Sequence, residues 1–123
     1  ISSKYIKKEL KNIKGNKNLS FVKEGMSLVT KEGGTAAFIG RTSDYNVSAK
    51  TGTAQVFGLK EGQVYNEATL PDRLKDHALF IAFAPSEDPK LVVSIIVENG
   101  GHGGSTAGPI AKKVFDAYIN ETN

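Results

Sequence analysis

The 123-residue sequence is 39% hydrophobic, 8% aromatic and 24% charged, which is typical of one globular domain and excludes a disordered segment or a two-domain enzyme. Its net charge of +3 is too small to indicate nucleic-acid binding, and its lack of cysteine excludes disulfides, thiolate metal ligands and cysteine nucleophiles. No apolar run approaches the ~18 residues of a membrane span. Because the first residue is Ile1, we expect the chain to be a piece of a longer protein.

Two helices are expected in the N-terminal part of the chain. Apolar side chains recur at near-helical spacing between lysines over 4–14, which predicts a short amphipathic helix. After a break at 15–18, a second helix is expected from about Leu19 to Thr30, with Ser20 as its N-cap. Its predicted buried stripe consists of Phe21, Val22, Met26 and Val29.

The positive charge is concentrated at the N-terminus. Residues 1–17 hold six lysines against Glu9 alone, a net charge of +5, which leaves −2 for residues 18–123. Nucleic acid or anionic lipid headgroups could bind such a segment. However, Tyr5 is the only aromatic residue among the lysines, which favours a solvated helix face. We therefore expect no nucleic-acid partner.

Three strands are expected in the middle of the chain. Residues 47–57 combine polar and small side chains and predict one strand, and 58–76 predict a long hairpin loop. Residues 78–84 and 91–97 are near-continuous apolar runs on either side of a turn rich in proline and acidic residues. They predict an antiparallel hairpin covered on both faces, although the sequence supplies only part of the second layer that this requires.

A C-terminal helix is expected after the glycine-rich segment 98–105. Pro109 suits the first turn of a helix. A broad apolar face follows, formed by Ile110, Ala111, Val114, Phe115, Tyr118 and Ile119. The predicted fold class is therefore α+β, with three antiparallel strands, flanking helices and a C-terminal helix packed on the sheet.

The segment Lys50–Thr53, Lys-Thr-Gly-Thr, carries the strongest chemical signal. Side chains alternate along a strand, so Lys50 and Gly52 point to one side. Thr51 and Thr53 then point to the other. An ammonium group, two hydroxyls and backbone N–H groups left accessible by a glycine suit a bound carboxylate and a developing oxyanion. The alternative is an exposed edge strand with a solvated lysine.

Lys-Thr-Gly is also one of three signature elements of the serine β-lactamases and penicillin-binding proteins. It stands here on the first of three expected antiparallel strands that precede a C-terminal helix. Further segments look familiar from the same proteins: 21–26, 33–36, 49–59, 76–77, 82–85 and 98–101. From about residue 19 to 118 the chain resembles the class B penicillin-binding transpeptidases that serve elongation in Gram-negative rod-shaped bacteria.

The resemblance implies a peptidoglycan D,D-transpeptidase that cross-links stem peptides through a serine acyl-enzyme and is acylated by β-lactams. Lys50 would be the catalytic residue of this segment, with its charge beside the substrate carboxylate and the S-x-N serine. Thr51 would hydrogen-bond that carboxylate, and Gly52 would let the peptide lie against the strand. Thr53 would give its backbone N–H to the oxyanion hole and its hydroxyl to the ligand carboxylate.

The two other signature elements of the family are an S-x-x-K, whose serine attacks, and an S-x-N. No Ser-x-Asn occurs in the sequence, and its one S-x-x-K is Ser20–Lys23. Ser20 stands 30 residues before Lys50, whereas the family's nucleophile lies much further upstream, so we do not expect Ser20 to be catalytic. We expect residues 1–123 to be the C-terminal portion of a transpeptidase domain without these two elements, and inactive alone.

Neither a cofactor nor a metal ion is expected. His77 and His102 lack the clustered carboxylates that would complete a metal site. We expect His77 to open a strand and His102 to be exposed. Residues 100–108 lack the lysine and threonine of a phosphate-binding loop, and the strand expected before them is antiparallel.

Partners and location follow from the resemblance. It implies peptidoglycan stem peptides, β-lactams and membrane proteins of the elongation complex as partners of the full enzyme, at the periplasmic face of the bacterial inner membrane. This chain would not itself carry the anchor, and its apolar strands could lead to self-association. Two other classes stay open: a non-catalytic module that binds a carboxylate or peptidoglycan, and a basic nucleic-acid-binding domain.

Overall fold

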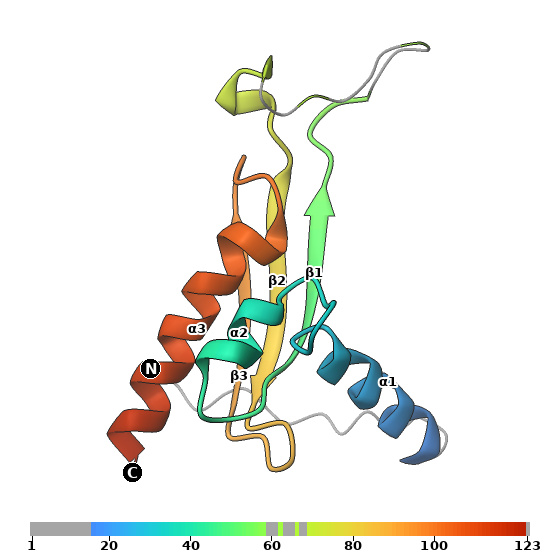
Figure 1. The fold of residues 1–123 in the computed structure, drawn as a ribbon. Helices are drawn as coiled ribbons and strands as arrows, with labels where there is room; N and C mark the ends of the chain where they lie inside the picture. The colour runs from blue at the N-terminus through green and yellow to red at the C-terminus, as the bar shows by residue number, and fades with distance from the viewer. Residues whose placement is uncertain (1–15, 59–61, 63–65, 67–68, 123) are drawn as a thin grey trace, which may run out of the picture.

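A computed structural model describes residues 16–58, 62, 66 and 69–122, and it shows a three-stranded sheet with helices beside it (Figure 1). In chain order the elements are α1 (Asn16–Leu28), α2 (Ala37–Thr42), β1 (Ser48–Ala54), the short 3-10 helix η2 (Asp72–Leu74), β2 (His77–Ala84), β3 (Leu91–Val97) and α3 (Gly103–Thr122). The predicted α+β fold class is confirmed. The helix expected over 4–14 lies outside the described residues.

The sheet has the strand order β1-β2-β3, and both neighbouring pairs are antiparallel. β2 and β3 form the hairpin predicted from the two apolar runs, and His77 opens β2 as expected. β1 is shorter than the strand expected over 47–57, because its pairing with β2 ends where Ala54 faces His77. The Lys-Thr-Gly-Thr segment therefore lies on an outer strand of the described sheet.

One face of the sheet forms the core together with α3. Alternate residues of β2 are buried on this face, namely Ala78, Phe80, Ala82 and Ala84. Three fully buried residues of α3 join the same core cluster: Ala107, Ala111 and Phe115. Alanines on both elements let the helix approach the strands closely, and Phe80 and Phe115 fill the remaining space.

The C-terminal helix begins earlier than expected. α3 starts at Gly103, six residues before Pro109, so the prediction that Pro109 lies in its first turn is wrong. Glycine is a poor helix former, but Thr106 fixes the first turn. Its amide donates to the His102 carbonyl oxygen at 3.0 Å, and its hydroxyl donates to the Gly100 carbonyl oxygen at 2.7 Å.

The apolar face of α3 is narrower than predicted. Ala111 and Phe115 are buried, but Ile110, Val114 and Tyr118 are each about 40% exposed. No helix of the described residues, α3 included, is long and apolar enough to cross a bilayer.

The opposite face of the sheet is apolar and largely uncovered. Ile81, Val92 and Ile96 are 48%, 72% and 64% exposed. The sequence predicts burial of the hairpin on both faces, but within the described residues only the α3 side has a covering layer. The incomplete second layer noted in the sequence is thus visible as an exposed apolar surface.

α1 projects away from the sheet beside β1 (Figure 1). It begins at Asn16, so Ser20 lies inside the helix and is not its N-cap. Phe21 and Val22, predicted to be buried, are 62% and 57% exposed, because the outer turns of α1 lie beyond the reach of the described sheet. Val29, just after the helix, does pack against the core.

The short helix α2 was not predicted from the sequence. Its Ile39 is fully buried in the core cluster. Gly40 lets α2 lie against the end of α1, because a Cβ atom at this position would collide with the carbonyl oxygen of Thr30. α2 thus contributes Ile39 to the same core that α3 forms with the sheet.

A polar cluster fastens α3 to the segment before β1. The Tyr45 hydroxyl donates to Asp116 at 2.6 Å, and Lys112 forms an ion pair with the same carboxylate at 2.7 Å. Burial and the bond to Asp116 raise the pKa of the Tyr45 hydroxyl. Burial opposes the charged form of Asp116, but the hydrogen bonds from Lys112 and Tyr45 prevail and keep the pKa of Asp116 below its ordinary value.

This cluster predicts a pH dependence of stability. Because the pKa of Asp116 is lower in the folded chain, the cluster stabilises fully above the unfolded pKa of about 4, and this contribution is lost as the pH falls through the folded pKa. Tyr45→Phe is expected to cost about 1 kcal/mol at pH 7 and less at pH 2.5. Urea unfolding of both proteins at the two pH values measures the difference, and an equal cost at both values would contradict the role of the Asp116 charge.

Candidate functional site

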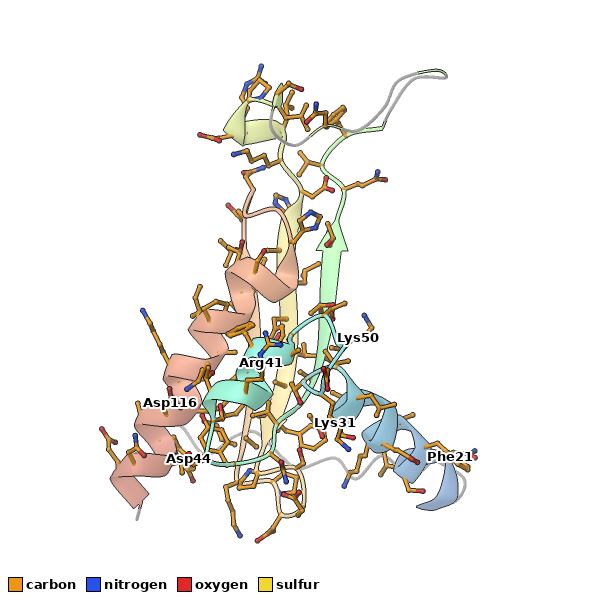
Figure 2. All side chains as sticks on the ribbon, in the orientation of Figure 1. Phe21, Lys31, Arg41, Asp44, Lys50 and Asp116 are labelled. Atoms are coloured by element: carbon orange, nitrogen blue, oxygen red, sulfur yellow. The ribbon has the colours of Figure 1, made fainter. Side chains whose placement is uncertain are left out.

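The two sides of β1 separate the groups of the Lys-Thr-Gly-Thr segment. Thr51 pairs with Phe80 and shares the core face with α3, whereas Lys50 pairs with Ile81 on the uncovered face. In Figure 2 the Lys50 side chain extends from the outer side of β1, away from α3. Lys50 is exposed, and its Nζ atom donates to the carbonyl oxygen of Thr51 at 2.5 Å. The ammonium group therefore stays beside the outer edge of the strand.

The two threonines of the segment line a hollow of about 390 Å³ between β1 and the start of α3. Residues of the turn before α2 and of the β3–α3 connection also line the hollow. Its lining consists of Thr35, Thr51, Thr53, His102, Gly103, Gly104 and Ser105. Hydroxyls, an imidazole and the first turn of a helix surround it, which is a suitable environment for a carboxylate.

Two glycines allow the start of α3 to lie directly against the strand. A Cβ atom on Gly103 would collide with the carbonyl oxygen of Leu79 and would lie 2.6 Å from that of Gly52. A Cβ atom on Gly104 would collide with the carbonyl oxygen of Thr35. Gly103 and Gly104 are therefore required for close packing at the hollow.

The turn between β3 and α3 is held by the segment that leads into β2. Asn99 has a positive φ of 54°, and its backbone amide donates to Nδ1 of His77 at 2.9 Å. Its side-chain amide donates to the carbonyl oxygens of Arg73 and Lys75, at 3.1 and 2.9 Å. These bonds fix the turn, and with it the wall of the hollow that contains His102.

The two histidines have different surroundings. His77 accepts the hydrogen bond from Asn99, and His102 is exposed at the hollow, as expected. The described residues contain no group of three or more histidine, aspartate or glutamate side chains that could hold a metal ion. The hollow itself offers hydroxyl groups, an imidazole and backbone N–H groups, whereas the Lys50 ammonium group lies on the other side of β1.

Ser20 and Lys23, the single S-x-x-K of the sequence, lie on α1 and are both exposed. Neither residue lines the hollow beside Thr51 and Thr53.

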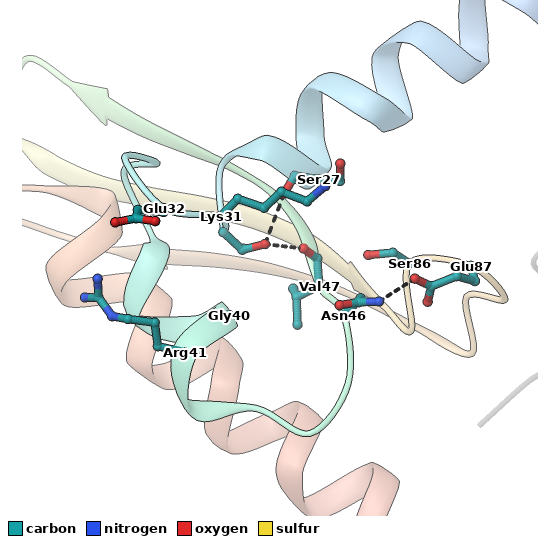
Figure 3. Close-up of a pocket in the computed structure, with 10 residues that line it drawn as sticks. Ser27, Lys31, Glu32, Gly40, Arg41, Asn46, Val47, Ser86 and Glu87 are labelled. Atoms are coloured by element: carbon teal, nitrogen blue, oxygen red, sulfur yellow. Dashed lines mark hydrogen bonds between the residues drawn. The ribbon is translucent and has the colours of Figure 1, made fainter.

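A second cavity, of about 430 Å³, lies at the other end of β1 (Figure 3). It is formed by the end of α1, by α2 and by the β2–β3 turn, and charged side chains of both signs line it, namely Lys31, Glu32, Arg41 and Glu87. Its inner polar groups bond to each other: Thr30 donates to the Val47 carbonyl oxygen at 2.6 Å, and Asn46 donates to Glu87. This pairing leaves it a weaker candidate than the hollow on β1.

Sequence reasoning did not assign the hydroxyls of Thr35 and Ser105 to the site, and it did not show how residues 102–105 come to lie beside β1. Thr35 lies 16 residues before Thr51, yet the two hydroxyl oxygens are 3.1 Å apart. Thr35 belongs to the familiar segment 33–36, but nothing in that segment by itself assigns its hydroxyl to the site. The contact of 102–105 with β1 depends on packing between segments distant in sequence, which no local pattern indicates.

Comparison with known proteins identifies this arrangement. Residues 7–116 match the model of the penicillin binding protein transpeptidase domain. Over 100 residues the chain is 49% identical to the peptidoglycan D,D-transpeptidase MrdA of Haemophilus influenzae, covering 80% of this chain and 15% of that protein. The chain thus spans about 15% of the length of this curated relative.

Solved structures agree with the sequence relatives. Penicillin-binding protein 2 of Pseudomonas aeruginosa, in complex with WCK 5153, superposes with a TM-score of 0.69 at 37% identity, covering 85% of this chain and 20% of that one. Penicillin-binding protein 2 of Helicobacter pylori, in complex with MreC, gives 0.69 at 30% identity, covering 87% and 18%. This chain belongs to the penicillin-binding protein transpeptidase domain family.

Proposed function

We propose that residues 1–123 are the C-terminal portion of the transpeptidase domain of a peptidoglycan D,D-transpeptidase. The observation that carries the proposal is the outer strand with Lys50 beside it and with Thr51 and Thr53 on one hollow. Relatives with this activity match most of the chain. The nucleophilic S-x-x-K and the S-x-N are then supplied by residues outside 1–123, and this chain alone does not complete the acyl-enzyme cycle.

Within this function the family resemblance gives each residue of the segment a role, and Thr51 and Thr53 line the hollow in which those roles would be exercised. Lys50 is the catalytic residue, supplying positive charge at the strand edge for the substrate carboxylate and the S-x-N serine. Thr51 donates its hydroxyl to the carboxylate, and Gly52 leaves the edge open for the peptide. Thr53 offers its backbone N–H to the oxyanion and its hydroxyl to the carboxylate.

The partners and location follow from the same proposal. The substrates of the full enzyme are peptidoglycan stem peptides, and β-lactams acylate its serine. The Helicobacter pylori relative was solved with MreC, which supports a membrane-associated elongation protein as partner of the full enzyme. The place of action is the periplasmic face of the inner membrane. In the full enzyme, the exposed apolar face formed by Ile81, Val92 and Ile96 contacts the remainder of the domain. In the isolated chain this face has no such contact, and we expect it to cause self-association.

A chimera tests the proposal directly. The matching part of the Haemophilus influenzae relative is replaced by this chain, and acylation by a fluorescent penicillin is followed with time. We expect the chimera to be acylated, and Lys50→Ala to slow acylation at least about tenfold, because a hydrogen bond to a charged group is lost. The 123-residue chain alone is expected to form no covalent adduct by intact mass.

Lys113→Ala is the matched control, since Lys113 is an exposed lysine on α3 outside the hollow. It is expected to leave the rate unchanged. Equal rates for Lys50→Ala and Lys113→Ala would refute the role of Lys50. An adduct on the isolated chain that disappears in Ser20→Ala would refute the assignment of the nucleophile to residues outside 1–123.

A further inference from the structure

The Thr35 hydroxyl contacts the hydroxyl of Thr51 at the hollow. Their oxygens are 3.1 Å apart, and both residues line the same space. The neighbouring Lys50 ammonium group donates to the carbonyl oxygen of Thr51 and not to its hydroxyl. Thr35 is therefore the hydroxyl partner of Thr51 in this structure.

Thr35 is held in place from two sides. The amide of Ala36 donates to the Val29 carbonyl oxygen at 2.9 Å, which ties the turn to the end of α1. Gly34 sits so close to the same end of α1 that a Cβ atom would lie 2.5 Å from the Leu28 carbonyl oxygen. From the other side, Gly104 of α3 lies so close that a Cβ atom on it would collide with the Thr35 carbonyl oxygen. The Thr35 backbone is thus fixed relative to both β1 and α3.

We propose that Thr35 is a positioning residue of the carboxylate site. The Thr35 hydroxyl donates to Oγ1 of Thr51, which leaves the Thr51 proton for the ligand carboxylate. A hydroxyl that accepts one hydrogen bond becomes a better donor for the next. The bond from Thr35 therefore strengthens the hydrogen bond that the Thr51 hydroxyl donates to the carboxylate. This inference rests on the proposed function, since it assumes that Thr51 binds the carboxylate.

The test measures reversible binding to the full 123-residue chain by backbone amide NMR titration. The probe is N-acetyl-D-alanyl-D-alanine, and its C-terminal amide is the uncharged comparison. Thr35→Val removes the hydroxyl but keeps the side-chain shape, and we expect the dissociation constant for the carboxylate probe to rise about fivefold. The dissociation constant for the amide probe is expected to change by less than about twofold, because the hydrogen bond from Thr51 is strong only when its acceptor is charged.

Three further variants separate positioning from general structural damage. Thr35→Ser retains the hydroxyl and is expected to bind as the wild type does. The double variant Thr35→Val/Thr51→Val is expected to bind no more weakly than Thr51→Val alone, because Thr35 acts through Thr51. Thr42→Val is the matched control: Thr42 is an exposed threonine outside the hollow whose hydroxyl donates to the Phe38 carbonyl oxygen.

The outcomes distinguish this inference from the function on which it rests. If Thr51→Val weakens binding of the carboxylate probe and Thr35→Val does not, the role of Thr35 is refuted and the carboxylate site stands. Additive effects of the two valines would also refute it. If neither the wild type nor any variant prefers the carboxylate to the amide, the proposed function of the site fails and the inference falls with it.

Discussion

Gly103→Ala is expected to lower the free energy of unfolding by about 3 kcal/mol, which is the upper end for overpacking, and to displace the start of α3 from β1. The added methyl group would collide with the Leu79 carbonyl oxygen and would lie 2.6 Å from that of Gly52. Both are backbone atoms of paired strands, so they cannot move aside as a flexible side chain would. Urea unfolding followed by circular dichroism measures the loss.

Gly25→Ala is the matched control for this glycine. Gly25 lies inside α1, and nothing stands within 4 Å of the place where its Cβ would be. Alanine is expected to stabilise the chain there by about 1 kcal/mol, because it is the better helix former. If the two variants unfold at the same urea concentration, the close contact between α3 and the strand edge does not exist.

Phe115→Ala is expected to cost 3–5 kcal/mol, roughly, because it leaves a cavity between α3 and the sheet. Phe115 is fully buried, and its ring meets that of Tyr45 edge-on, with the centroids 6.5 Å apart and the planes at 66°. Such a pair adds to the energy of apolar burial. A loss of this size removes much of the stability of a domain of this length, so thermal and urea unfolding both report it.

Phe21→Ala is the matched control, because it also removes a phenylalanine side chain but from an exposed position. Phe21 is 62% exposed on α1, and its replacement is expected to change stability by no more than about 0.5 kcal/mol in the isolated chain. The sequence predicts the reverse for Phe21, because it counts that residue in a buried stripe. A loss of several kcal/mol for Phe21→Ala would show that α1 packs against the sheet in solution.

The strands and the position of the lysine motif could be predicted because their signals are local. The runs 78–84 and 91–97 are long, apolar and separated by a clear turn, and β2 and β3 match them closely. The motif Lys50–Thr53 then has to fall on the strand before them. Alternation along that strand suffices to separate the lysine from the threonines.

The exposure of α1, the start of α3 and the position of Thr35 could not be predicted, because they depend on contacts between segments that are distant in the sequence. Periodicity shows that Phe21 lies on an apolar face, but not whether another layer covers that face in this chain. The helical state of Gly103 depends on its fit against Leu79 and Gly52, although its own propensity opposes it. Thr35 enters the hollow only because α1, β1 and α3 meet there.

The alternation of β1 also imposes a constraint on chain length. Tyr45 is anchored to Asp116 on α3, and four residues stand between it and Lys50. Inserting or deleting one residue in that interval would turn Lys50 toward α3 and both threonines toward the uncovered face. The Lys-Thr-Gly-Thr sequence would be unchanged, yet its ammonium group and its hydroxyls would lie on the opposite faces of the sheet. The count of residues between the Tyr45 anchor and the lysine is therefore as much a part of the site as the motif itself.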